Sequence, residues 1–203
     1  MKTLLPLILA LTVIPSLASA QDLRLPAPQK TGGKPLMQAL AERKSTRQYA
    51  NRDLDQQTLA NLLWAAYGFN REDKRTVPSS QNRQEIDLYV FLKSGVYLYD
   101  AKANTLIAKA SGDHRKTAGT QEYVATAPLN LVYVANLDKA SNRDAACIDC
   151  GFIGQNVYLF CASENLVTVL RAGLDKKALS ELLKLNANQE ALYNQCVGYP
   201  PVP

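Results

Sequence analysis

Residues 43–47 read Arg-Lys-Ser-Thr-Arg and place three cations around two hydroxyl groups. Arginine binds phosphate through two parallel hydrogen bonds, and a serine hydroxyl adds a further donor. Alternate residues of an extended segment point to the same side, so Arg43, Ser45 and Arg47 would lie together. This stretch is a candidate phosphate site, with Lys44 as an additional cation. Alternatively, the cations only complement the dipole at the end of a preceding helix.

A second polar stretch, residues 78–84, directly precedes a predicted strand. Loops that enter a rigid sheet often contact ligands. The side-chain amides of Asn82 and Gln84 both donate and accept hydrogen bonds, which suits the amide and carbonyl edges of a flat heteroaromatic ring. The residues offered by this loop are Pro78, Ser79, Ser80, Asn82 and Gln84. An ordinary polar turn is the alternative interpretation.

The cysteines permit a third kind of chemistry. Cys147 and Cys150 form a C-x-x-C pair, which can be a redox pair when a thiol pKa is lowered. The alternating strands and helices that usually surround such a pair are absent, so a structural disulfide or two core residues are alternatives. His114 is the lone histidine, so the C-x-x-C pair lacks the second pair of ligands that a zinc site would need. Cys161 falls in an apolar run and is expected to be a buried thiol.

The amino-terminal residues 1–20 have the pattern of a signal peptide. Lys2 precedes a short apolar stretch, and Ala18-Ser19-Ala20 has the small residues of a cleavage site. The stretch is shorter than the roughly 20 residues that span a bilayer. We therefore expect a periplasmic or secreted protein without stable membrane insertion.

The remaining chain is expected to form an extended arm over residues 21–34 and one domain over residues 35–203. The 203-residue chain has a formal net charge of +5, but its basic residues are scattered and not interleaved with aromatic residues. This distribution argues against nucleic-acid binding.

Two helices are predicted before the polar loop. Pro35 opens a short one over residues 35–43. Asp53 or Asp55 caps the next, and Gly68 stands where a helix ends. The apolar residues of this second helix repeat with helical spacing at Leu59, Leu62, Leu63 and Ala66.

The period then changes to that of strands. Residues 86–100 contain two β-rich runs around Lys93–Gly95, and residues 105–110 form a third. Residues 127–137 predict a central strand, 151–165 a helix buried on every side, and 166–170 another strand. Asp175 caps a last helix whose inner face comprises Ala178, Leu179, Leu182 and Leu183. This order predicts an α+β fold, and no glycine-rich nucleotide fingerprint is present.

The two polar stretches, in this order, resemble the FMN-dependent nitroreductase family. Residues 165–175 (NLVTVLRAGLD) resemble the family's strand beneath the flavin ring, and residues 197–200 (VGYP) resemble its closing motif. The resemblance spans about residues 35–200, and within the family the chain is similar to SagB-type dehydrogenase-like members. It implies a mixed, mainly antiparallel sheet flanked by helices, in an intertwined homodimer that binds FMN at its interface.

The resemblance also implies roles for individual residues. Arg43 and Ser45 hold the FMN phosphate, Arg47 reaches the pyrimidine side of the ring, and a backbone amide near residues 170–172 donates to flavin N5. The full set implied is Arg43, Lys44, Ser45, Arg47, Pro78, Ser79, Ser80, Asn82, Gln84, Leu170, Arg171 and Ala172. Contacts from residues 79–82 come in part from the partner subunit.

The sequence departs from the family pattern at two places. Its carboxyl end, VGYPPVP, lacks the basic residues that many relatives add to the phosphate site, so Lys44 or Arg75 would substitute. Position 171 is an arginine where relatives often have a small or acidic residue. We expect its side chain to face solvent.

The implied activity is a ping-pong reaction in which a small-molecule donor reduces FMN and a nitroaromatic, quinone or similar small acceptor takes the electrons. One alternative is a flavin-binding protein without turnover. Another is a thiol-disulfide redox protein that uses Cys147 and Cys150.

Overall fold

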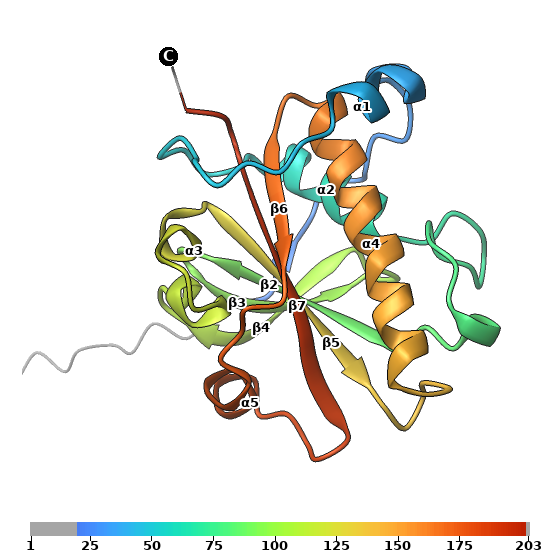
Figure 1. Cartoon of the computed structure of the whole chain (residues 1–203), viewed down its shortest axis with the longest axis vertical. Coiled ribbons are helices and arrows are strands. Elements are labelled where there is room, and N and C mark those ends of the chain that lie inside the picture. The colour runs from blue at the N-terminus through green and yellow to red at the C-terminus, as the bar shows by residue number, and fades with distance from the viewer. Residues whose placement is uncertain (1–19, 202–203) are drawn as a thin grey trace, which may run out of the picture.

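The computed structural model describes residues 20–201, and the expected signal peptide lies outside them except for Ala20. A seven-stranded sheet has the order β1-β4-β3-β2-β5-β7-β6, with every neighbouring pair antiparallel and helices on both faces (Figure 1). The strands are β1 (Leu23–Arg24), β2 (Ile86–Leu92), β3 (Gly95–Asp100), β4 (Thr105–Ser111), β5 (Leu129–Asn136), β6 (Val167–Arg171) and β7 (Gln189–Gly198). The helices are α1 (Leu36–Glu42), α2 (Gln56–Tyr67), α3 (Glu122–Thr126), α4 (Arg143–Ser163) and α5 (Lys176–Leu183), and 3₁₀ turns cover Ser80–Asn82 and Arg115–Ala118. The predicted α+β class is confirmed.

Helix α2 forms as its sequence predicts. The Asp55 carboxylate accepts a hydrogen bond from the Thr58 amide at 2.8 Å, so Asp55 and not Asp53 is the cap. The four residues of the predicted apolar face are all buried in the core between α2, α4 and the sheet. The helix ends at Gly68, whose φ of −72° is extended rather than left-handed.

Helix α4 begins eight residues earlier than predicted, at Arg143. The Asn142 side chain caps it by accepting a hydrogen bond from the Ala145 amide at 2.8 Å. Cys147 and Cys150 therefore lie inside the helix, and all four cysteines are free thiols. Although α4 is long and apolar enough to cross a membrane, its buried face packs on α2 and the sheet as a core helix does.

Within one chain, the predicted burial of this helix on every side is incomplete. Ile148 and Phe152 are one helical turn apart and remain 60% and 41% exposed.

The opposite face of the sheet is covered by α3 and α5. Asp175 caps α5 by accepting a hydrogen bond from the Ala178 amide at 3.0 Å, as predicted. Leu179 and Leu183 are buried, while Ala178 and Leu182 are half-buried.

Strand β7 was not predicted, although it lies between β5 and β6. Its sequence, QEALYNQCVG, contains Asn194 and Gln195, which are fully buried. Polar residues usually indicate a solvated segment, but here the amides pair with other buried polar groups.

The segment after α1 continues the sheet beyond β6. Ser45 forms a parallel bridge with Thr168, and the Thr46 amide donates to the Thr168 carbonyl at 2.9 Å. Residues 44–46 thus lie along the outer edge of β6, which fixes the side chains on either side of them.

Two carboxylates lie between α4 and the loop before β2. Asp149 is 4% exposed and accepts a hydrogen bond from the Ser80 amide at 3.0 Å. Glu85 is 1% exposed, and neither of its carboxylate oxygens has a hydrogen-bond partner in the described part of the chain. Burial, together with the neighbouring Asp149, raises the pKa of Glu85 to about 7, against a smaller opposing effect of Arg83.

Replacing Glu85 with glutamine should change stability in a pH-dependent way. Folding raises the pKa of Glu85, so the unfolded chain releases this proton at a lower pH than the folded protein does. The contribution of protonated Glu85 to stability is therefore complete below about 4.5, the ordinary pKa, and is lost as pH rises through about 7. Glu85→Gln should therefore increase the free energy of unfolding by about 1–3 kcal/mol at pH 8 and change it little at pH 4.5.

Urea unfolding at the two pH values measures this difference, with Glu181→Gln on the exposed face of α5 as the control. An equal effect of Glu85→Gln at both pH values would contradict the assignment.

Candidate functional site

The predicted phosphate segment lies along the open edge of β6. Among residues 20–201, the Arg43 guanidinium contacts only the Tyr158 ring, whose centroid is 5.1 Å away. Arg47 is exposed and makes no side-chain hydrogen bond or ion pair with any residue of the described range 20–201. Two arginines whose donors are unused, with Ser45 between them, form a donor set that suits a phosphate dianion.

Lys44 and Thr46 line a separate cavity of about 390 Å³ with Asn165 and Pro200. The extended segment therefore divides its side chains as the alternation predicts, with Arg43, Ser45 and Arg47 outside this cavity. In one chain, Lys44 thus lines a different surface from Arg43 and Ser45.

Tyr158 of α4 connects the phosphate segment to the end of β6. Its hydroxyl lies 2.8 Å from the Ser45 hydroxyl and accepts a hydrogen bond from the Leu170 amide at 3.0 Å. Since the Arg43 guanidinium stacks on its ring, Tyr158 contacts residues of both predicted groups. Its only sequence signal was a hydroxyl within an apolar helix.

The residues at the end of β6 differ in what they offer a ligand. The Leu170 amide is already bonded to Tyr158. Ala172 is exposed, and its amide has no acceptor among residues 20–201. Ala172 is therefore the available donor of this group, at an open position one residue beyond the strand.

The Arg171 side chain does not face solvent as predicted. It is 9% exposed, and its guanidinium donates to Gln121, Asn194 and the Gly173 carbonyl. The reason is that polar acceptors from α3, β7 and the following loop surround it inside the protein.

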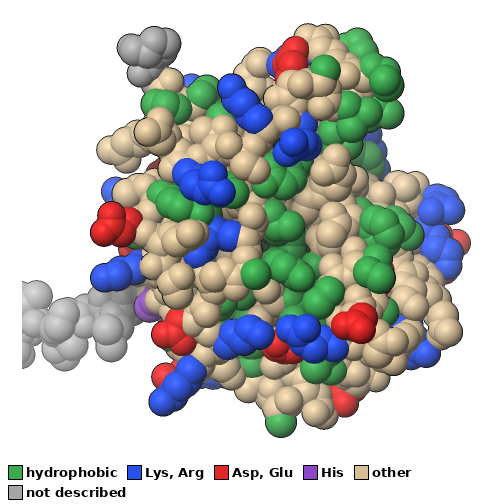
Figure 2. Space-filling view, in the orientation of Figure 1, with side chains coloured by type: hydrophobic (Ala, Val, Ile, Leu, Met, Phe, Trp, Pro, Cys, Tyr) green, Lys and Arg blue, Asp and Glu red, His purple; other side chains and the backbone are tan. Residues whose placement is uncertain are grey.

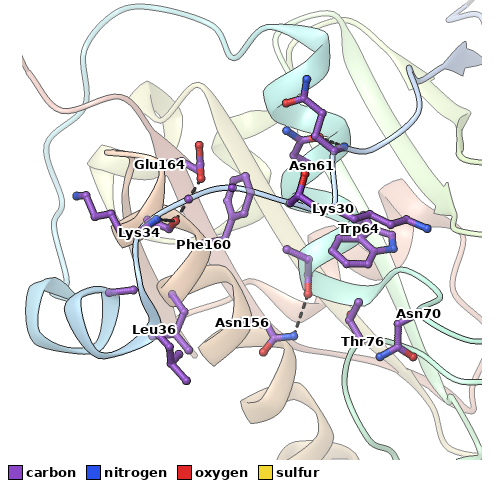
Figure 3. Close-up of a pocket in the computed structure, with 18 residues that line it drawn as sticks. Lys30, Lys34, Leu36, Asn61, Trp64, Asn70, Thr76, Asn156, Phe160 and Glu164 are labelled. Carbon is purple, nitrogen blue, oxygen red and sulfur yellow. Dashed lines mark hydrogen bonds between the residues drawn. The ribbon is translucent and has the colours of Figure 1, made fainter.

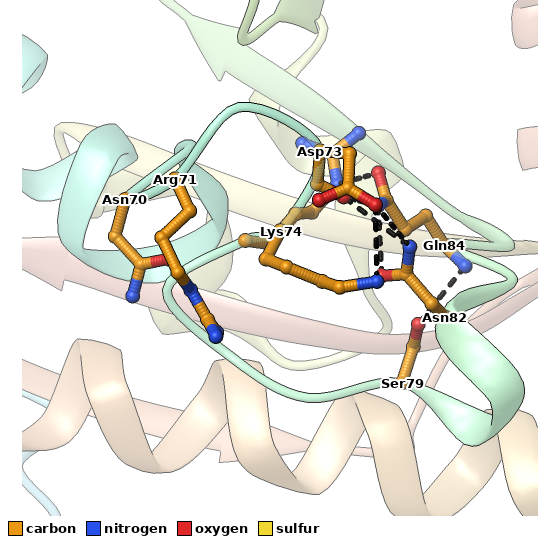
Figure 4. Close-up of polar contacts among 8 residues, drawn as sticks. Asn70, Arg71, Asp73, Lys74, Ser79, Asn82 and Gln84 are labelled. Carbon is orange, nitrogen blue, oxygen red and sulfur yellow. Dashed lines mark hydrogen bonds and ion pairs between the residues drawn. The ribbon is translucent and has the colours of Figure 1, made fainter.

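The loop of residues 78–84 is held by its own polar side chains and by residues 73–75 (Figure 4). Gln84 donates to the Asp73 carbonyl at 2.7 Å and to the Asn82 side chain at 3.0 Å, and it accepts from Arg75 at 3.1 Å. Asn82 also donates to the Asp73 carbonyl, at 3.3 Å. The two amides are thus largely engaged within the protein.

This loop is also strained. Gln81, Asn82 and Gln84 have φ angles of 53°, 57° and 50°, in the left-handed region that favours glycine. Such strain persists where the surrounding structure enforces it, and it is concentrated at functional sites. Ser80 is fixed by Asp149 and by a 3.1 Å contact with the Ser141 hydroxyl.

In one chain, the two predicted groups contact α4 at separate places. The loop group contacts α4 at Asp149, and the phosphate segment contacts it at Tyr158. Nine residues of helix separate these contacts, which corresponds to about 14 Å along the axis. Arg75 contacts the loop group through Gln84 and is stacked on Tyr67 and Phe69.

Apolar side chains are exposed beside these groups. Leu36, Met37 and Leu40 of α1 are 63%, 76% and 42% exposed, in addition to Ile148 and Phe152 of α4. Figure 2 shows hydrophobic side chains over α1 and along α4 on one face of the molecule. A set of this kind commonly marks a protein–protein interface.

A cavity of about 700 Å³ lies among the arm, α1, α2 and α4 (Figure 3). Trp64 and Phe160 form apolar walls, while Lys30 and Asn156 add polar groups. None of the predicted site residues lines it. The cavity is therefore separate from the phosphate segment and from the loop of residues 78–84.

Comparison with known proteins agrees with this fold. The chain is 35% identical to a candidate nitroreductase of Ralstonia eutropha, whose crystal structure superimposes with a TM-score of 0.85 over 98% of this chain and 100% of that one. A candidate nitroreductase of Methanocaldococcus jannaschii is 28% identical over 74% of this chain and 84% of its own length.

A candidate NADH dehydrogenase/NAD(P)H nitroreductase of Parabacteroides distasonis shares the fold, with 21% identity and a TM-score of 0.60 over 83% of this chain and 88% of that one. The model of the nitroreductase family matches residues 40–199, which include both predicted groups and β6. The chain belongs to the nitroreductase family.

Proposed function

We propose that this chain is an FMN-dependent oxidoreductase that reduces a nitroaromatic, a quinone or a similar small acceptor by a ping-pong mechanism. The observation that carries the proposal is the alignment of Arg43, Ser45 and Arg47 along the edge of β6, with both guanidinium groups free of carboxylates. The exposed Ala172 amide at the end of the same strand supports it.

In this proposal the chain binds and orients, and bound FMN supplies a ring that accepts two electrons and passes them on. Arg43 and Ser45 hold the phosphate with charge-assisted hydrogen bonds. Arg47, two residues further along the edge, contributes positive charge on the pyrimidine side, where it stabilises developing negative charge. The Ala172 amide donates a hydrogen bond near N5.

A homodimer would complete the site. The phosphate segment and the loop of residues 78–84 contact α4 about 14 Å apart, so in a dimer each chain could contribute one of the two groups to a shared site. The exposed apolar residues of α1 and α4 support the same assembly, because contact with a second copy would bury them.

Two observations indicate which electron donors to test. The relative from Parabacteroides distasonis is described as an NADH dehydrogenase/NAD(P)H nitroreductase, so nicotinamides are the first donors to test. The amino-terminal pattern supports a periplasmic or secreted location, where cytoplasmic NAD(P)H is not freely available. We therefore include a periplasmic electron carrier as the second donor class.

The thiol-disulfide alternative has less support. Burial raises the pKa of the Cys150 thiol well above its usual range, which disfavours the reactive thiolate. Replacing Cys147 and Cys150 with serine should leave flavin-dependent activity intact, whereas complete loss of activity would favour the thiol model.

An absorbance spectrum of the purified protein tests the proposal, followed by anaerobic addition of NADH, NADPH and then dithionite. Flavin bands that bleach with a nicotinamide and return with a quinone would support the proposed reaction. Bleaching with dithionite alone would direct the search to another donor. A colourless protein that also fails to bind added FMN would refute the proposal.

Replacing Arg43 tests the phosphate site. Arg43→Ala should weaken FMN binding by about 1.5–3 kcal/mol, because hydrogen bonds to a charged phosphate are lost. Fluorescence quenching of FMN measures the affinity. Lys44→Ala is the matched control because Lys44 lines the cavity on the other side of the segment. Equal losses in the two variants would show that general positive charge, and not this geometry, binds the phosphate.

Removing the Tyr158 hydroxyl tests whether its contacts with Ser45 and Leu170 support FMN binding. Tyr158→Phe leaves the Leu170 amide without its acceptor and frees Ser45, so FMN binding should weaken by about 1 kcal/mol. Tyr97→Phe is the control, since it removes a similar contact, 3.1 Å from the Ser94 hydroxyl, in the β3 strand. Unchanged affinity in Tyr158→Phe would contradict the assignment.

A further inference from the structure

Arg171 is a buried cation surrounded by neutral groups. Its guanidinium donates to the Gln121 side chain at 2.6 Å, to the Gly173 carbonyl at 2.5 Å and to the Asn194 side chain at 3.2 Å. Its carbon lies 5.7 Å from the centroid of the Tyr123 ring. With 9% exposure, the residue has little access to water.

No carboxylate neutralises this charge within the described range 20–201. The ion pairs there join other residues. Burial raises the pKa of the Cys196 thiol, and the charge of Arg171 opposes this effect in part. A buried charge that is hydrogen-bonded but unpaired costs stability and is attracted to any anion formed nearby. Arg115, by contrast, is paired with Asp113 at 2.7 Å.

The surrounding backbone is fitted to this side chain. A Cβ at Gly119 would collide with the guanidinium, and one at Gly173 would lie 3.0 Å from it. Two loops, residues 119–121 and 172–173, thus close around Arg171. One of them carries the exposed Ala172 amide, so the charge is hydrogen-bonded to the residue that follows the proposed ring contact.

We propose that Arg171 is a positioning residue that holds the Ala172–Gly173 segment through the Gly173 carbonyl and, by its unpaired charge, favours the reduced over the oxidised form of bound FMN. This inference rests on the proposed function. Electrostatic attraction in a poorly hydrated interior decays slowly with distance, so the charge acts on the ring without touching it. The charge of Arg171, within β6, would add to that of Arg47, which follows the segment paired with the outer edge of β6.

The test compares three variants by potentiometric titration of the FMN-loaded protein. Arg171→Met removes the charge and the donors, Arg171→Lys keeps the charge, and Gln121→Leu removes one acceptor while Arg171 stays charged. We expect Arg171→Met to lower the preference for reduced over oxidised FMN at least tenfold, which is about 30 mV for a two-electron couple. Arg171→Lys and Gln121→Leu should stay within threefold of the unaltered protein.

Two results would overturn the inference. One is an unchanged potential in Arg171→Met. The other is an equal fall in Gln121→Leu, which would mean that loop order and not charge sets the potential. Should Arg171→Met fail to fold, Arg171→Gln carries the same expectation, since it keeps hydrogen-bonding capacity without charge. Failure of the unaltered protein to bind FMN would instead refute the proposed function, so the two failures are distinguishable.

Discussion

The packing of α4 on the sheet is the constraint on which both groups of the site depend. Asp149, near one end of the helix, holds the Ser80 amide, and Tyr158, two and a half turns later, holds Ser45 and the Leu170 amide. Gly154 lies between them, where a Cβ would come within 3.0 Å of Leu170. A larger residue there would require the Leu170 side chain to move by a few tenths of an ångström. Helix α4 thus fixes the loop of residues 78–84 and the phosphate segment at two separate places.

The sheet beneath α4 is held by polar groups as well as by its apolar core. On the α4 face, Tyr133 donates to Gln195, which in turn donates to Thr168 at 3.1 Å. On the other face, Asn194 accepts from Arg171 and donates to Asn130 at 3.3 Å. These buried networks fasten β6 to β7 from both sides, leaving the outer edge of β6 to pair with residues 44–46. The position of the proposed phosphate site follows from that pairing.

Local sequence rules predicted most of the elements and the site segments. The cap and spacing of α2, the central β5 strand and the cap of α5 required only nearby residues, and the alternation of Arg43, Ser45 and Arg47 follows from extended backbone alone. The roles of these residues rest on a resemblance, because cations beside hydroxyls do not by themselves name a ligand.

What the sequence could not predict depends on contacts between distant segments. Strand β7 was hidden because Asn194 and Gln195 are polar, and their burial is possible only with partners from other strands. The orientation of Arg171 depends on Gln121, fifty residues away. Tyr158 stood in an apolar run, where packing is the ordinary interpretation, and its hydroxyl gains meaning only from Ser45 and Leu170. The start of α4 is different, since Asn142 was a readable cap in a segment without apolar periodicity.

The most direct measurement is a crystal structure of the protein grown with FMN. The proposed site requires the phosphate to lie between Arg43 and Ser45 at the edge of β6 and the ring to lie beside Ala172. It also requires a second copy of the chain to contribute the loop of residues 78–84. A phosphate bound elsewhere, or both groups contributed to one FMN by the same chain, would contradict it.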